Sequence, residues 1–369
     1  MKLINKISKA FAVVTVALLS FSCENDTENV IEKYPTIAEI LEKNATSDYS
    51  VLIKALKATQ LYAVTTNPGS YTLFAPNNAS FATFSSASIP AGTLVNTTDF
   101  TTLTTTQLID LKRILMNHFI VTGTLTSDLP SGGYVKTYSP YLTSTSIGLS
   151  AYITKTSDIQ INGGTSNGGT KITTGDINAS NGVIHYVESV MKLPTLVSSV
   201  ISNPNLSTLL SVVTNPAQSS VLGQLTTPVN NTQLFAPSNT AFETALAAGG
   251  YLDGKSATDI SKILRYHIAT AGTFTQTAVV GTSTGNINNG ASGATSFLPS
   301  AATTDATVTT RQNVTGSTTV FQTLRIEKNS VKIFENPART IAPSIFKTVN
   351  IHTSNGIIHI VDRVLQPVL

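Results

Sequence analysis

The stretch 72-TLFAPNNASF-81 is followed later in the chain by 233-QLFAPSNTAF-242. In each copy an apolar strand runs up to a proline, which ends the strand because it has no backbone N–H to donate. The polar residues after the proline can cap a short helix by accepting hydrogen bonds from its free amides. An internal repeat decides the domain organisation before any local assignment, so the extent of this repeat matters most.

Two further landmarks recur in the same order. Ile114-Leu115 with His118 corresponds to Ile263-Leu264 with His267, and 181-NGVIH-185 corresponds to 355-NGIIH-359. Apolar residues at helical spacing precede both histidines, whereas alternating residues after each Asn-Gly pair indicate a strand. The Asn-Gly pair itself predicts a tight turn that tolerates a positive φ. Each unit is therefore predicted to be α+β, with helices first and strands later.

The distance between landmarks differs between the copies. His118 and Asn181 are 63 positions apart, whereas His267 and Asn355 are 88 apart. A fixed core with variable loops behaves in this way. The extra residues fall within 273–346, where a long insertion either carries function or is a neutral elaboration of the surface. We predict a first domain over residues 34–192 and a second over residues 193–369, joined by a short linker.

Residues 1–22 have the order of a bacterial lipoprotein signal peptide. Lys2, Lys6 and Lys9 precede an apolar run that ends before Ser22-Cys23, and Cys23 is the only cysteine. The run is shorter than the roughly 20 residues that a membrane-spanning helix needs. Cleavage before Cys23 would leave this residue lipidated, with residues 23–33 as a polar tether. Cleavage and release without lipid is the alternative.

Composition and charge argue against a nucleic-acid partner. The chain is 41% hydrophobic and 12% charged, and removal of the three N-terminal lysines takes its formal charge from +3 to zero. A neutral chain without a Lys/Arg run has no electrostatic footprint for nucleic acid or anionic lipid. We therefore expect membrane contact through the N-terminal lipid only. The predicted location is the cell envelope, at the outer membrane, with exposure on the outer surface as a further alternative.

The three landmarks resemble the hallmarks of the fasciclin (FAS1) domain family. Residues 72–81 and 233–242 look like its T-x-F-A-P-x-N-x-A-F segment. Its Tyr-His pair is present as Tyr266-His267, but Asn117 precedes His118 in the first copy. Its closing N-G-x-I-H-x-I-D-x-V-L strand is nearly complete in the second copy, including Asp362, where the first copy has Glu188. The resemblance implies two domains, each a twisted β-sandwich or wedge flanked by helices.

The resemblance also implies that the repeated motif residues are structural. They are Phe74, Pro76, Asn78, His118, Asn181, Gly182, His185, Phe235, Pro237, Asn239, Tyr266, His267, Asn355, Gly356, His359 and Asp362. A metal or acid–base role for the four histidines is the alternative, but no cysteine cluster, His-x-x-x-His or Asp-rich loop accompanies them. We predict no metal, cofactor or catalytic residue. His352, between Ile351 and Thr353, is predicted to be an exposed strand residue.

Two local patterns resemble enzyme motifs without their structural context. Residues 281-GTSTG-285 match the hydrolase nucleophile pattern around Ser283, but loop-forming residues follow where a helix is needed. The glycine-rich residues 162–169 lack the Lys-Ser/Thr ending and the helix of a phosphate-binding loop. We interpret residues 162–169 as the tip of a hairpin.

The favoured function is a non-enzymatic adhesion or binding module at the cell surface, which is what the family resemblance implies. Its partner would be a surface protein or a glycan. The alternative is a binding protein for a small apolar ligand or a polysaccharide, accessory to nutrient capture. A hydrolase comes third because it rests on Ser283 alone. The second domain keeps the family pattern better and is the expected binder.

Overall fold

The computed structural model describes residues 34–44, 48–96, 100–141, 147–227, 232–270, 281–282, 295–296, 306–313, 321–326, 332–335 and 342–369. Residues 35–369 form one compact unit, which contains both repeats. The predicted signal peptide, Cys23 and the tether lie outside the described residues, as do Ser283 and most of the segment 273–346.

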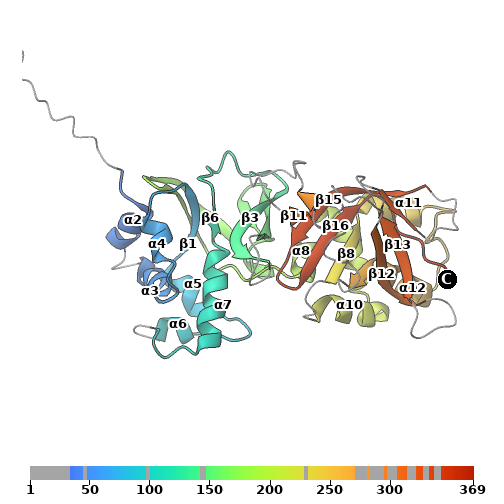
Figure 1. Ribbon diagram of the computed structural model, residues 1–369, viewed down its shortest axis with the longest axis horizontal. Coiled ribbons are helices and arrows are strands. Elements are labelled where there is room, and N and C mark those ends of the chain that lie inside the picture. The colour runs from blue at the N-terminus through green and yellow to red at the C-terminus, as the bar shows by residue number, and fades with distance from the viewer. Residues whose placement is uncertain are drawn as a thin grey trace, which may run out of the picture. The chain divides into compact units, whose positions relative to one another are not determined.

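A seven-stranded sheet with the order β2-β1-β7-β6-β5-β4-β3 builds the first repeat (Figure 1). Its strands are β1 (Tyr71–Pro76), β2 (Phe119–Ile120), β3 (Gly133–Pro140), β4 (Gly148–Lys155), β5 (Ile159–Ile161), β6 (Thr170–Ala179) and β7 (Gly182–Val187). Strands β1 and β7 are parallel, and the other neighbours are antiparallel. This pairing places the first and third sequence landmarks side by side.

The second repeat has the same strand order but closes into a barrel, β12-β13-β14-β15-β16-β8-β9. Its strands are β8 (Thr232–Pro237), β9 (Ile268–Thr270), β12 (Ala306–Asn313), β13 (Phe321–Ile326), β14 (Lys332–Phe334), β15 (Ser344–His352) and β16 (Gly356–Val361). A pairing of Thr310 with Ala269 joins β12 to β9 and closes the barrel. The equivalent strands β3 and β2 are not hydrogen-bonded neighbours in the first sheet. Each wedge is therefore one curled sheet.

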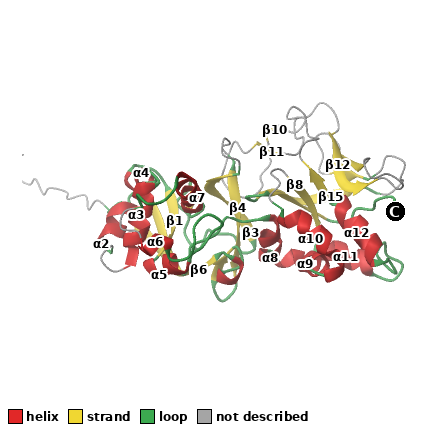
Figure 2. Ribbon diagram, turned by 90° about the horizontal axis from the view of Figure 1, so that it is seen from below, coloured by secondary structure: helices red, strands yellow, loops and turns green. Residues whose placement is uncertain are grey.

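Helices cover the sheet of each repeat. The first repeat contains α2 (Ile37–Lys43), α3 (Ser50–Ala58), α4 (Tyr62–Thr66), α5 (Asn78–Thr83), α6 (Thr93–Asn96) and α7 (Thr105–Met116). The second contains α8 (Leu196–Ser202), α9 (Ser207–Val213), α10 (Ser219–Thr226), α11 (Asn239–Leu246) and α12 (Ala257–Tyr266). Figure 2 shows α8 to α12 together on one side of β8, β12 and β15.

Local sequence explains where these helices begin and what they bury. Thr36, Thr104 and Thr195 each accept a hydrogen bond from the backbone three residues on, within a capping box that satisfies free helix amides. The buried faces of the helices then pack on the central strands in one apolar cluster per repeat. No single helix among the described residues is long and apolar enough to cross a membrane. The helical segments Leu196–Ser202 and Pro204–Val213, which are bent relative to each other, together have the length and composition of a span, and nothing else supports one.

The Asn-Gly landmark lies at a tight turn, as predicted, and its glycine has a further role. The turn between β6 and β7 consists of Ser180 and Asn181, and Asn181 does not have a positive φ. Gly182 does, with a φ of 152°, and a Cβ there would lie 2.0 Å from the Tyr71 carbonyl oxygen. A Cβ on Gly356 would similarly lie 2.4 Å from the Thr232 carbonyl oxygen. Close approach of the parallel strand therefore requires both glycines.

Candidate functional site

His118 and His267 tie the end of a helix to the segment that follows the last strand of each repeat. In the first repeat, His118 Nδ1 lies 2.8 Å from the Ile114 carbonyl, and Nε2 accepts the Met191 N–H at 2.9 Å. His267 makes the same two contacts, with Ile263 and Leu365, at 2.8 Å each. A carbonyl can only accept and an amide N–H can only donate, so each ring is the neutral Nδ1–H tautomer. Burial lowers the pKa of both histidines to about 4.

His185 and His359 hold a bulge in the neighbouring strand. The Asp176 N–H donates to His185 Nδ1 at 3.1 Å, and the Asn350 N–H donates to His359 Nδ1 at 3.2 Å. Asp176 and Asn350 both have a positive φ, 62° and 59°, where the register of the strand pair shifts. Burial lowers the pKa of His185, and lowers that of His359 to about 3.

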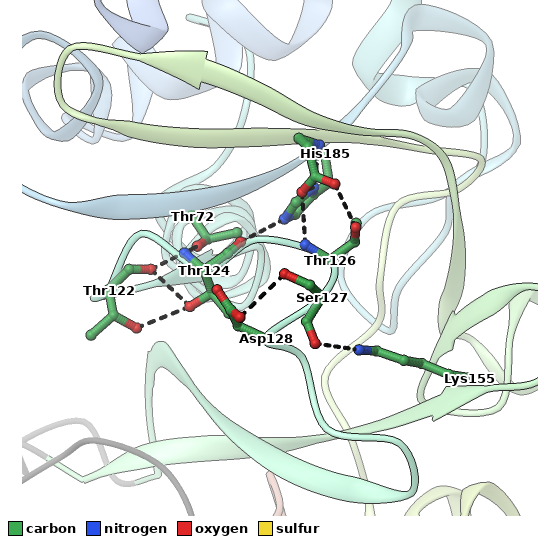
Figure 3. A network of polar contacts seen from close by, with 9 residues as sticks. Thr72, Thr122, Thr124, Thr126, Ser127, Asp128, Lys155 and His185 are labelled. Carbon is green, nitrogen blue, oxygen red and sulfur yellow. Dashed lines mark hydrogen bonds and ion pairs between the residues drawn. The ribbon is translucent and has the colours of Figure 1, made fainter.

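Figure 3 shows the polar network around His185, which fixes the exposed loop after β2. His185 Nε2 donates to the Thr124 carbonyl at 2.9 Å. The Thr126 amide and hydroxyl both donate to the Asp176 carboxylate, at 2.7 and 2.5 Å. Thr72 Oγ1 accepts the Thr124 N–H at 2.8 Å. The loop over residues 121–128 is thus held by hydrogen bonds from three strands, β1, β6 and β7, although most of it faces solvent.

This loop presents two apolar side chains to solvent. Val121 is 49% exposed and Leu125 is 38% exposed. The loop that corresponds to it in the second repeat follows β9 and lies outside the described residues. An apolar pair on an ordered loop can bury its surface against a partner without a large cost for ordering the loop. We call residues 121–128 the display loop.

Asn181 and Asn355 are buried hubs that join the turn to the helices. Asn181 Oδ1 accepts the Ile37 N–H at 2.9 Å, and Nδ2 donates to the Thr65 and Asn67 carbonyls at 3.0 Å each. Asn355 likewise accepts the Leu196 N–H at 2.8 Å and donates to the Leu225 carbonyl at 3.1 Å. A helix start and the end of a helical segment therefore depend on one side chain in each repeat.

The landmark that contains Phe-Ala-Pro combines core packing with hydrogen bonds to earlier helices. Phe74 and Phe235 are fully buried and lie opposite His185 and His359 in the parallel strand pairs. The residues that end these strands, Pro76 and Pro237, precede the helices α5 and α11. Asn78 and Asn239 do not cap the helices that they begin. They accept the N–H groups of Val51 and Thr208 in the preceding helices, at 2.9 and 3.0 Å.

At two positions where the copies differ, the side chains make hydrogen bonds to different partners. Tyr266 is fully buried, and its hydroxyl donates to the Thr323 carbonyl at 3.0 Å. Asn117 instead donates to the Lys192 carbonyl at 3.2 Å and accepts from the Thr137 hydroxyl at 3.0 Å. Asp362 accepts the Ile345 N–H at 2.7 Å, and Glu188 accepts from the Thr165 hydroxyl at 2.8 Å.

The prediction of an exposed His352 is wrong. Its side chain is only 1% exposed, because β15 of the second repeat packs against β4 of the first. The alternation in the sequence identified a strand but not the repeat that covers it.

In the described part of the chain, the motif residues connect helices, strands and loops through buried hydrogen bonds. The part of the chain that the structure describes contains no group of three or more His, Cys, Asp or Glu residues arranged to hold a metal ion. The glycine-rich residues 162–169 lie between β5 and β6 and include a single 3₁₀ turn, Thr165–Asn167. In the hydrolase-like pattern, Gly281–Thr282 pairs with Thr295–Ser296 as a strand, while Ser283 lies outside the described residues.

Two copies of one wedge, stabilised by similar buried contacts, define a tandem of repeated α+β modules. The family profile of the fasciclin domain matches residues 47–194 and 204–367. The chain therefore belongs to the fasciclin domain family.

Known proteins that are similar to this chain include a cyanobacterial protein and an insect cell adhesion molecule. Protein sll1483 of Synechocystis sp. (strain ATCC 27184 / PCC 6803 / Kazusa) is 30% identical over 160 residues, which cover 43% of this chain and 74% of that protein. The solved structure of a FAS1 domain pair from the insect cell adhesion molecule fasciclin I is 16% identical. It has a TM-score of 0.46, with coverage of 86% of this chain and 95% of that one.

Proposed function

We propose that this chain is a lipid-anchored adhesion or binding module of the cell envelope, without enzymatic activity of its own. Its membership of the fasciclin family carries the proposal, because fasciclin domains are adhesion and binding modules that are typically extracellular or on the cell surface. The structural contacts of the motif histidines support the absence of enzymatic activity in this proposal. His118, His185 and His267 are buried, and both ring nitrogens of each are hydrogen-bonded to backbone groups, so they are poorly placed to act on a substrate.

The proposed anchor is a lipid on Cys23. In cells fed a labelled fatty acid, we expect the full chain to carry label and to sediment with membranes. Cys23→Ser should lose the label and appear in the soluble or released fraction, because no other cysteine is present to be acylated. A label that survives Cys23→Ser, or a wild-type chain that is never labelled, would contradict the anchor.

We further propose the display loop as a contact surface for a surface protein or a glycan of another cell. Val121 and Leu125 are apolar and solvent-exposed on a loop that hydrogen bonds hold in place. Exposed apolar side chains on a fixed backbone favour a protein partner. They contribute to binding when a complementary apolar surface on the partner removes them from water. This places a candidate contact in the first repeat, whereas the sequence favoured the second.

Adhesion of cells that carry the full chain tests this surface. We expect Val121→Asp with Leu125→Asp to reduce attachment or aggregation about tenfold, the effect of losing a small binding hot spot. The matched control is Val95→Asp with Ile109→Asp, which adds the same charge at apolar side chains 36% and 56% exposed on α6 and α7. Both double variants should retain the wild-type melting temperature.

The results of these experiments distinguish a failure of the display-loop proposal from a failure of the adhesion proposal. Equal loss of adhesion in the two double variants, or no loss in either, would remove the display loop from the proposal. Unchanged adhesion and aggregation after deletion of the whole gene would remove the adhesion function itself.

The alternative of a carrier for a small apolar ligand finds less support in the described residues. In the barrel of the second repeat, apolar side chains from several strands and α12 are buried against one another. They are Phe235, Tyr266, Ala269, Leu324, Ile326, Ile333, Phe346, Val361 and Leu365. The described part of the barrel interior is therefore occupied by core packing.

A further inference from the structure

A lysine of the first repeat reaches into the second. Lys136 on β3 places its Nζ 2.7 Å from Ser150 Oγ on β4, 2.7 Å from the Asn350 carbonyl oxygen and 2.6 Å from His352 Nδ1. Asn350 and His352 belong to β15, more than 200 residues further along the chain. Three acceptors match the three N–H groups of an ammonium. Among the described residues, no carboxylate forms an ion pair with Lys136.

The surroundings of His352 keep water away from this contact. Its backbone N–H donates to Ser150 Oγ at 2.9 Å, and its ring centre lies 5.0 Å from that of Tyr141. Tyr141 belongs to a buried apolar cluster drawn from both repeats, which also contains Ile147, Leu149 and Ile357. The Lys136–His352 hydrogen bond is therefore part of a packed interface.

The other polar contacts between described residues of the two repeats are uncharged. Asn203 Nδ2 donates to the Tyr134 hydroxyl at 3.1 Å, and Asn167 Nδ2 donates to the Ser198 carbonyl at 2.8 Å. These groups keep one charge state at ordinary pH. The Lys136–His352 pair is thus the contact, among those described between the repeats, whose charge changes near neutrality.

The hydrogen bond between Lys136 and His352 is lost when the amine and the imidazole are both protonated. The hydrogen bond between the two groups needs a lone pair on one of the two nitrogens, and a protonated imidazole beside an ammonium offers none. Burial lowers the pKa of Lys136 to about 7. Burial, then the charges of Lys136 and His359, lower the pKa of His352 well below its ordinary value. The titratable groups packed around the pair are Tyr141 and, on β16, His359.

We propose that Lys136 and His352 form an acid-sensitive latch between the two fasciclin repeats. The latch is closed while the pair carries at most one positive charge, and it opens when the amine and the imidazole are both protonated. In the open state the solvated imidazole takes up its proton near its ordinary pKa of 6.5. The closed state takes it up only at lower pH, so falling pH favours opening. Mild acid would then free the two repeats to change their relative orientation.

Distances between spin labels on the two repeats test the latch in the full chain. The full chain with Cys23→Ser receives two new cysteines for the spin labels, Ala82→Cys on α5 and Glu243→Cys on α11. Both positions are exposed. We expect one narrow distance distribution at pH 7.5 that broadens as the pH falls towards 5. His352→Gln keeps an oxygen that can accept from the ammonium but cannot be protonated. The broadening should therefore move down by about one pH unit or more in this variant.

A control variant and a folding measurement complete the experiment. Lys171→Gln on β6 removes a partly exposed lysine that pairs with Asp158 at 3.0 Å, and it should behave as wild type. Far-UV circular dichroism on the same samples identifies the lowest pH at which the chain is still folded. Identical broadening in wild type and His352→Gln would overturn the latch. A wild-type distribution that stays narrow down to that lowest pH would overturn it as well.

Discussion

Acidification from pH 7 to pH 4 is expected to remove about 6 kcal/mol from the free energy of unfolding through His118 and His267 alone. In the folded chain both rings use Nε2 to accept a backbone N–H, from Met191 and from Leu365. Burial disfavours the charged ring and lowers each pKa to about 4. A proton on Nε2 would also point at the backbone N–H that this nitrogen accepts, so the hydrogen bond would be lost. The gap from the ordinary value of about 6.5 is worth roughly 3 kcal/mol per ring.

The direction of this effect follows from proton binding. In the unfolded chain these histidines bind protons as the pH falls through 6.5, whereas in the folded chain they bind them only near pH 4. Unfolding therefore becomes more favourable as the pH falls from 6.5 to 4. Below pH 4 both states are protonated and these two rings add nothing further. His185 and His359, whose pKa values are also lowered, act in the same direction.

Urea unfolding followed by circular dichroism at half-unit steps from pH 7.5 to pH 4 measures this loss. The total stability of a domain is about 5–15 kcal/mol, so the chain should be close to unfolding at the acid end. His267→Gln should be less stable at pH 7 but should show a shallower dependence on pH. A stability that is flat between pH 6.5 and pH 5 would show that these histidines do not resist protonation.

Replacement of Asn181 by alanine is expected to cost about 4 kcal/mol of stability. The change leaves one buried backbone N–H, of Ile37, and two carbonyls, of Thr65 and Asn67, without their partner. Each unsatisfied buried group costs about 1–3 kcal/mol, and partial access of water at Asn67 reduces the sum. The start of α2 and the end of α4 would lose their common attachment to the β6–β7 turn.

Denaturant midpoints of Asn181→Ala and of a surface control measure this cost. Asn215→Ala removes an exposed side chain that accepts only the Ala217 N–H at 3.0 Å, and it should cost about 1 kcal/mol. Asn355→Ala should resemble Asn181→Ala because it performs the same task in the second repeat. If Asn181→Ala and Asn215→Ala cost the same, the hub role of Asn181 is wrong.

Local sequence carries much of the fold because the repeated signals depend on neighbours in the chain. Proline after 73-LFA-75 ends a strand, threonine caps begin α2, α7 and α8, and the spacing before His118 forms a helix. These are backbone hydrogen-bond and periodicity effects over a few residues. Because three such signals occur twice in one order, the sequence also indicated two copies of one α+β unit and its fasciclin resemblance.

Tertiary structure decided what those residues touch, because partners far apart in the chain leave no local pattern. Asn181 reads as a turn residue, yet it is a buried hub for groups more than 100 positions away, and Gly182 is required by strand β1. His352 reads as exposed, yet the other repeat buries it beside Lys136. By itself, the sequence determined the repeated unit and its helix and strand signals. The curled sheet determined which amides, carbonyls and charges meet, since only three-dimensional packing brings them within hydrogen-bonding distance.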